Sequence, residues 1–572
     1  MWLRGHGPGV TILDLKDGCS ADLEIDWDGW TLPRDPEPRA GVETIDRDDE
    51  PGFAGWALGG PLTAALALVG LVQLATWIPH YLTWPYWADH DVFATAARAW
   101  DRGDRPYRDI RLNNFPGTIY LFWALGKLGG WGKAAYLHAF DAGLVLTLIG
   151  AMLIWSRRRF GRFLPAMVGM IAFLSYYLSL DYSHAAQRDW HASCLAMLGL
   201  LVAQASNGRR GGRIVSALLT ALGLSIRPQV VVFLPALLLA SVAAGRADEE
   251  RRSGRSAWRG VEWVAFLAVF TALAFAPLAI AGVLGDFTRS LKLVAFGSEY
   301  NRVNPTSLVK AWIVQASEVR WLVVPAGILL LAGRGRPGTW ATARAWLLAM
   351  AGASFYKPIS PMAHSYLDLP LVLVWSINLS VLAAFASEAS GASARFRLAA
   401  VIGLLGMGTT TLHPQSCAVG PCLQAYAVLR SGSEPEGQPP GYRKGSVATS
   451  AYYPWEAYRG VLDYLRRKTG PTTRVANVLK GDPAITSVVD RPSAFPAESV
   501  AWLRMVDGRD EGEFVESLRK AEDSVVLWSP DEEGPNPMFR VDEIEAEIRK
   551  LYDFEEVFGP IQVWRRKPAV KP

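Results

Sequence analysis

The stretch ADHDVFATAARAWDRGDRPYRDIRLNNFPGTIYLF, residues 88–122, contains the features that decide the fold. It opens with two carboxylates, Asp89 and Asp91, and the apolar spacing that follows predicts a short amphipathic helix. Clustered charges come next, and then an apolar stretch at 117–128. A long apolar run, 56–78, precedes the whole segment and is long enough to cross about 30 Å of hydrocarbon. The order predicts a membrane protein with a large loop after its first span.

Further apolar runs support this class. Half of the 572 residues are hydrophobic and 23 are Trp, which is more apolar than an ordinary soluble enzyme. Together with 56–78, the runs predict about eleven transmembrane helices. They cover 134–155, 163–180, 190–205, 214–226, 229–244, 261–283, 321–333, 340–354, 369–386 and 397–412.

Basic residues predict the orientation. With the N-terminus in the cytoplasm, every basic loop falls inside, as the excess of Lys and Arg in cytoplasmic loops requires. We therefore expect a multi-pass protein of the cytoplasmic membrane. The stretch 117–128 is then a re-entrant or interfacial helix, because counting it as a span would put the arginines at 157–159 outside. The basic loops are 157–162, 207–213, 246–259, 334–338 and 392–397.

Composition also divides the chain into parts. Residues 1–54 are polar, Pro-rich and acidic, without the apolar core of a signal peptide, and predict a disordered cytoplasmic segment. Residues 55–412 form the transmembrane domain, and 413–450 contain a Gly/Pro/Ser-rich linker. Residues 451–572 predict a small extracytoplasmic α/β domain for docking or acceptor binding, since they carry no phosphate loop, nucleophile elbow or metal spacing. Its expected helices are 455–468, 511–521 and 541–551, and its expected strands are 474–479, 524–528 and 561–564.

Several classes of partner are disfavoured. The net charge is +4, and the Lys and Arg cluster in short loops, which argues against nucleic acid. The four Cys form no disulfide scaffold or zinc pattern, and only Cys417 and Cys422 could pair. No metal-ligand set is indicated by the sequence, which leaves the cofactor unknown and a divalent metal open.

Two charged clusters flank predicted external ends of spans. Asp89 and Asp91 form the first, and the alternative to a catalytic role is helix capping, with Asp89 as N-cap and Asp91 stabilised by the helix dipole. The second cluster is DYSHAAQRDWH, residues 181–191, which includes Asp189. There the alternative is interfacial anchoring by Trp190 with solvated charges.

The order of these motifs resembles the GT-C polytopic glycosyltransferases, which include aminoarabinose transferases and protein O-mannosyltransferases. Residues 88–122 match the family's first external loop, QRDW matches its second acidic motif, and YKPISPMAHSYLDLP, residues 356–370, matches its late basic and Tyr-containing loop. Two departures stand out: His90 separates the acidic pair, and Asp141 occupies a position where a basic residue is expected.

The resemblance implies transfer of a sugar from a polyprenyl-phosphate donor to a glycan, lipid or protein acceptor at the outer face. A carboxylate would act as general base with inversion, and cations would hold the leaving phosphate. The catalytic candidates are Asp89, Asp91 and Asp189; the candidates for the donor phosphate are Lys357, Arg227, His364 and Tyr366. Arg227 could equally be an interfacial anchor. Lys357 lies in the loop that matches the family's basic motif, and a membrane-edge anchor is its alternative role. The rival functions are a transporter, suggested by Asp141, and a non-catalytic envelope protein.

Overall fold

A computed structural model describes the chain in two compact units, Met1–Gly52 and Phe53–Pro572. The described residues are 2–6, 9–13, 20–23, 60–112, 114–242, 255–292, 309–310, 312–313, 319–332, 336–359, 365–388, 399–404, 406, 419–431, 438–439, 442, 453–479, 483–496, 511–530 and 542–568.

The first unit contains a small antiparallel sheet. Its strands are β1 (Trp2–His6), β2 (Gly9–Leu13) and β3 (Ser20–Leu23), in the order β1-β2-β3. The polar sequence of residues 1–54 gave no expectation of this sheet.

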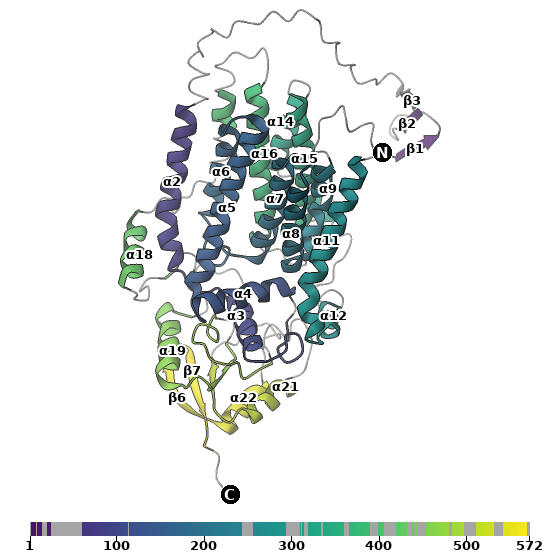
Figure 1. Cartoon of the computed structure of the whole chain (residues 1–572). Helices are drawn as coiled ribbons and strands as arrows, with labels where there is room; N and C mark the ends of the chain where they lie inside the picture. Colours follow the sequence, from purple (N-terminus) through teal and green to yellow (C-terminus); the bar gives the residue numbers. More distant parts are fainter. Residues whose placement is uncertain are drawn as a thin grey trace, which may run out of the picture. The chain divides into compact units, whose positions relative to one another are not determined.

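The second unit begins with a bundle of apolar helices (Figure 1). Four helices in the described part are long and apolar enough to cross a membrane: Pro61–Leu82, Ala134–Phe160, Ala257–Ile280 and Tyr366–Glu388. The bundle consists of α2 (Pro61–Leu82), α5 (Ala134–Phe160), α6 (Leu164–Tyr177), α7 (Arg188–Ala205), α8 (Arg210–Ile226), η1 (Pro228–Phe233), α9 (Leu234–Val242), α11 (Arg255–Ile280), α14 (Val319–Leu331), α15 (Pro337–Tyr356) and α16 (Leu369–Glu388).

The predicted apolar runs coincide with these helices from 56–78 through 369–386. The last run, 397–412, is only partly within the described residues. The polytopic helical class is therefore confirmed. The number of eleven spans is not confirmed, because several helices, such as α6 with 14 residues, are shorter than the roughly 20 residues that a membrane crossing needs.

The ends of the bundle differ in charge. Arg158 and Arg159, at the end of α5, donate to the last carbonyl groups of α7. Glu262, near the start of α11, pairs with Arg210 and Arg213 at the start of α8. The predicted basic loop 157–162 lies at the end of α5, and the predicted basic loop 207–213 joins α7 to α8. Both loops therefore lie at the same end of the bundle. Which side of the membrane this end faces stays a prediction.

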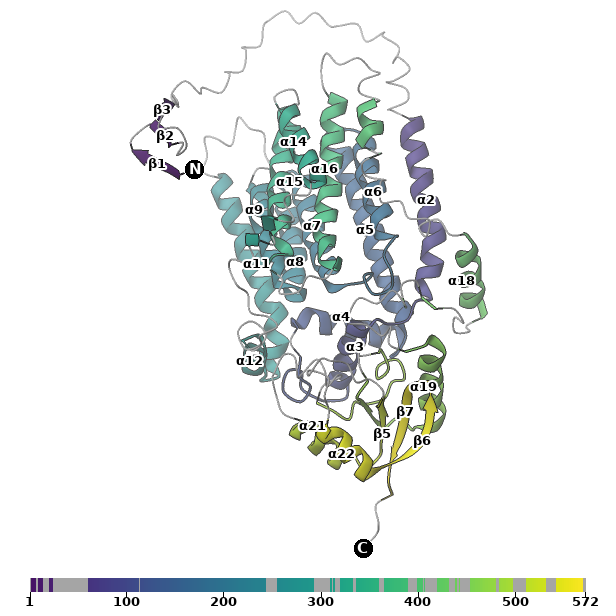
Figure 2. The same ribbon diagram turned by 180° about the vertical axis from the view of Figure 1, so that it is seen from behind.

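Two short helices cross the opposite end of the bundle. They are α3 (Ala88–Asp101), which the apolar spacing predicted, and α4 (Pro116–Gly129), which was expected as a re-entrant or interfacial helix. Figure 2 shows both of them between the bundle and the C-terminal domain. A further short helix, α12 (Leu284–Lys292), lies at the same end, and α18 (Val419–Ser431) packs beside α2.

The C-terminal region is an α/β domain, as the sequence predicted. Its sheet has the order β4-β5-β7-β6, in which only β4 and β5 are parallel. The strands are β4 (Arg474–Asn477), β5 (Ser524–Trp528), β6 (Tyr552–Phe558) and β7 (Ile561–Arg566), and the helices are α19 (Trp455–Lys468), α21 (Gly512–Lys520) and α22 (Asp542–Leu551). Strand β6 was not among the strands predicted from the sequence. Residues of α19 belong to the same hydrophobic core as the bundle, so this domain is packed onto the membrane part.

Close helix packing generates a testable prediction. Gly169 of α6 faces α16, and an added Cβ would collide with the carbonyl oxygen of Ser376 and the hydroxyl of Ser380. We expect Gly169→Ala to lower the free energy of unfolding by about 1–3 kcal/mol, the usual cost of overpacking. Gly150→Ala in α5 is the matched control, since nothing lies within 4 Å of its added Cβ. Thermal unfolding in detergent measures both, and equal melting temperatures would contradict the proposed packing constraint.

Candidate active site at the loop end of the bundle

The acidic pair lies in the first turn of α3, where the helix dipole favours carboxylates. Asp89 is not the N-cap. The cap is Trp87, whose backbone N–H donates to Nδ1 of His90 over 3.3 Å. Two residues apart on an α-helix are about 200° apart around its axis, so Asp89 and Asp91 point to different sides.

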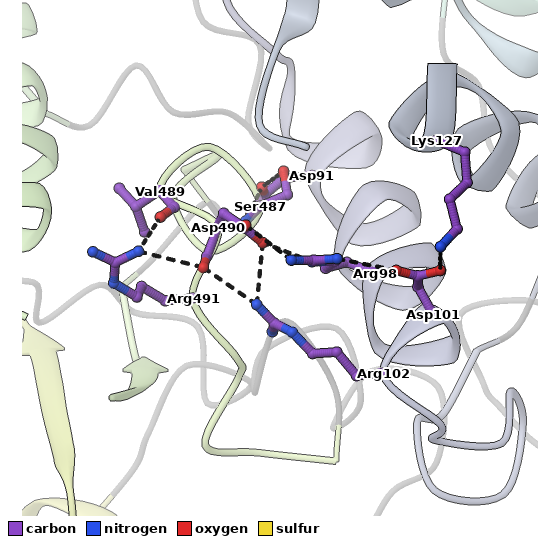
Figure 3. Close-up of polar contacts among 9 residues, drawn as sticks. All are labelled: Asp91, Arg98, Asp101, Arg102, Lys127, Ser487, Val489, Asp490 and Arg491. Atoms are coloured by element: carbon purple, nitrogen blue, oxygen red, sulfur yellow. Dashed lines mark hydrogen bonds and ion pairs between the residues drawn. The ribbon is translucent and has the colours of Figure 1, made fainter. Parts of the chain in front are cut away.

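Asp91 points toward the C-terminal domain. Its side chain is buried and accepts hydrogen bonds from the backbone N–H groups of Ile485, at 3.0 Å, and Ser487, at 2.9 Å. The Ser487 hydroxyl donates to it as well (Figure 3). Three hydrogen-bond donors of the C-terminal domain bind this carboxylate. Asp91 therefore attaches the C-terminal domain to α3.

Two arginines, one on α3 and one directly after it, extend this contact. Arg98 and Arg102 both bind the carboxylate of Asp490, at 2.8 and 3.1 Å (Figure 3). On the other side of Arg98, Asp101 forms an ion pair with it and a second one with Lys127 of α4. The loop at 485–490 is thereby held against α3 by the carboxylates of Asp91 and Asp490 and their donors, while Asp101 orients Arg98. We call these contacts the domain clamp.

Asp89 has a different environment. It is partly exposed, and it makes no hydrogen bond or ion pair with any residue that the structure describes. It interacts electrostatically with Arg188 and with Tyr366. A partly exposed carboxylate that no described residue binds is accessible to a substrate, which a general base requires.

Asp189, at the start of α7, is fully buried and paired. Arg227 donates to it over 2.8 Å, and the hydroxyl of Tyr356 donates over 3.1 Å. A buried carboxylate with these two donors is well satisfied. Asp189 therefore holds Arg227 in place, and Arg227 is not the solvated anchor that one interpretation of the sequence suggested.

Arg188 lies in the same region, although it was not among the catalytic or phosphate-binding residues predicted from the sequence. Its guanidinium lies 4.9 Å from the centre of the Phe93 ring and donates to the side-chain oxygen of Asn114. It is within electrostatic range of Asp89, Asp189 and Arg227. The sequence feature that could have predicted Arg188 as a site residue is its position directly before Asp189 in QRDW.

The remaining phosphate candidates are distributed unevenly. Tyr366 is buried and interacts electrostatically with Asp89, Asp189, Arg188 and Arg227, so it belongs to the same cluster. Lys357 follows Tyr356 but its ammonium group is bound to both carboxylate oxygens of Asp368, at 2.9 and 2.8 Å. His364 lies outside the described residues.

We call Asp89, Arg188, Asp189, Arg227 and Tyr366 the charged cluster. It unites the start of α3, the start of α7 and the segment after α8 at one end of the bundle. Of the three predicted acids, Asp89 and Asp189 share this cluster, whereas Asp91 forms its contacts with the C-terminal domain. Two guanidinium groups beside an unpaired carboxylate can bind a phosphate group and accept a proton.

Asp141, which the sequence raised as a transporter residue, is fully buried among the helices. Tyr81 and Tyr177 donate to one of its oxygens, at 2.7 and 2.6 Å, and Trp190 and His191 bind the other, both at 2.8 Å.

Within the described residues, no group of three or more His, Cys, Asp and Glu side chains could hold a metal ion.

Comparisons with known proteins identify the fold. No family model matches the chain, and no curated protein matches it. Its architecture is that of the GT-C membrane proteins. The chain is similar to ArnT from Cupriavidus metallidurans, an aminoarabinose transferase solved in the apo state, with a TM-score of 0.53 and 16% sequence identity. The match covers 91% of this chain and 99% of ArnT. The resemblance first seen in the motifs is thereby confirmed for the fold.

The domain clamp predicts how the C-terminal domain responds to loss of Asp91. Asp91→Ala leaves the buried amides of Ile485 and Ser487 without an acceptor, at about 1–3 kcal/mol for each unsatisfied group. Because 1.4 kcal/mol corresponds to a factor of ten, we expect hydrogen exchange at these amides to accelerate roughly tenfold or more. Asp104→Ala, at an exposed carboxylate after α3, is the control. Unchanged exchange in Asp91→Ala would mean that the clamp does not hold the domain.

Proposed function

We propose that this protein transfers a sugar from a polyprenyl-phosphate donor to a hydroxyl-bearing glycan, lipid or protein acceptor at the outer face of the cytoplasmic membrane. The fold that it shares with ArnT supports a membrane glycosyltransferase of the GT-C type. The observation that carries the proposal is the charged cluster, in which the unpaired carboxylate of Asp89 lies in the field of Arg188.

Asp89 is the proposed general base. The acceptor hydroxyl attacks the anomeric carbon, its proton passes to a carboxylate oxygen of Asp89, and the bond to the donor phosphate breaks with inversion. Asp91 is a weaker candidate, because three donors already occupy its oxygens. Asp189 is weaker for the same reason, since it is buried and paired with Arg227.

Arg188 and Arg227 are the proposed phosphate ligands. Negative charge on the leaving phosphate grows as the glycosidic bond breaks, and guanidinium groups fixed in advance stabilise it without reorganising. Asp189 fixes Arg227, and Asn114 with Phe93 fixes Arg188. The hydroxyl of Tyr366 is a further donor candidate in this cluster, whereas the pairing of Lys357 with Asp368 argues against a direct role for Lys357.

The rival functions receive less support. A transporter needs an intramembrane acid that exchanges partners, but Asp141 already has four donors and no exposure. A non-catalytic envelope protein has no need for an accessible carboxylate beside two partly buried arginines.

Substitution of Asp89 tests the base. We expect Asp89→Asn to reduce transfer by about two orders of magnitude or more, the usual contribution of a general base. In the host, a deletion strain should lose one glycan or glycolipid mass, which wild type and the control Asp104→Asn restore and Asp89→Asn does not. Full restoration by Asp89→Asn at equal membrane levels would rule out this base, and an unchanged glycan and lipid profile after deletion would rule out transfer.

Substitution of Arg188 tests the phosphate site. Arg188→Lys keeps the charge but loses the planar group that contacts both Asn114 and Phe93. We expect the KM for the lipid-linked donor to rise about tenfold, which corresponds to about 1.4 kcal/mol of lost binding. Arg108→Lys, at the ion pair with Asp286, is the control. A rise in KM only for the acceptor would contradict the assignment.

A further inference from the structure

A cavity of about 350 Å³ lies away from the charged cluster, between the bundle and the C-terminal domain. Its walls come from the end of α2, the start of α5, α18 and α19. Because α2 and α5 are both long and apolar enough to cross a membrane, the cavity lies where two such helices end. None of Asp89, Arg188 and Arg227 lines it.

One side of the cavity is apolar and continues to the outside of the bundle. Leu82 of α2 and Leu429 of α18 line it, and Leu429 is also 42% exposed. Beyond Leu429, the same helix exposes Leu423 and Tyr426, by 66% and 62%. An apolar chain could therefore pass from the cavity along a surface that is itself apolar.

The other side is aromatic and positively charged. Trp84 and Trp455 line the cavity, as expected for a site at the level of lipid headgroups. Three cations also line it, Lys133 just before α5 and Arg459 and Arg466 on α19, and none of the described lining residues is acidic. Of these three, Arg466 also pairs with Asp463 of its own helix at 3.7 Å. The charge of the cavity is thus complementary to an anion.

We propose that this cavity binds an anionic membrane phospholipid. Its headgroup phosphate contacts Lys133 and Arg459, and its acyl chains extend past Leu429 along α18 and α2. The volume is within the range of about 300–1,000 Å³ typical of small-molecule sites, and it suits a headgroup with its glycerol rather than a whole lipid. The lipid would join the ends of α2 and α5 to α19, and so couple the C-terminal domain to the bilayer surface.

Native mass spectrometry of the full-length protein in detergent tests this site. Phosphatidylglycerol and phosphatidylcholine with identical acyl chains are added at equal concentrations. We expect phosphatidylglycerol to bind at least tenfold more tightly, and the double variant Lys133→Ala/Arg459→Ala to lose at least tenfold of that affinity. Arg467→Ala is the matched control, because Arg467 is a cation of the same helix but does not line the cavity.

A second variant keeps the test independent of the charges. Leu429→Trp fills the apolar side and should weaken phosphatidylglycerol binding while all three cations remain. Equal binding of the two lipids, or full binding by both variants, would overturn the proposal. Saturation by inorganic phosphate at the same concentration would mean a free-anion site, and preferential binding of polyprenyl phosphate would mean a second donor site; each result would also overturn it.

Discussion

The buried carboxylate of Asp141 is the interaction on which the bundle depends. A charge in an apolar interior is tolerated only when hydrogen-bond donors surround it, and removing one donor costs several kcal/mol. Here the donors come from α2, α6 and α7, while Asp141 itself belongs to α5. Four helices must therefore meet at one point. Because Trp190 and His191 follow directly after Arg188 and Asp189, the same contact fixes the start of α7 and with it these two members of the charged cluster.

A third member of the cluster, Asp89, lies on α3, which is bound to the C-terminal domain. Asp91 and Arg98 lie on the helix whose first turn carries Asp89, Arg102 follows the last residue of that helix, and all three bind the loop at 485–490. A general base must keep its position within a fraction of an ångström to be effective. The domain clamp supplies such rigidity from outside the membrane. This gives the C-terminal domain a structural task.

Charges at this end of the bundle are mostly paired, and the exception carries the functional argument. Asp189 is satisfied by Arg227, Lys357 by Asp368, and Asp91 by backbone amides. Pairs of this kind fix geometry and cost little when both partners are present. Asp89 differs from these groups because no described residue forms a hydrogen bond or an ion pair with its carboxylate, although Arg188 interacts with it electrostatically. A partly exposed carboxylate that no described residue binds can contact a substrate, which makes Asp89 the candidate for binding one.

The sequence by itself determined the helical membrane class, the position of most helices, the interfacial helices and most elements of the C-terminal domain. These follow from local hydrophobic periodicity, which a linear sequence records directly. It also placed Asp89 and Asp189 at helix ends that could meet. Only the tertiary structure decided that Asp91 turns to Ser487, 396 residues away, that Arg188 joins the cluster, and that Asp141 binds four donors. Which partner a charged side chain takes depends on packing between distant segments, and periodicity carries no information about that.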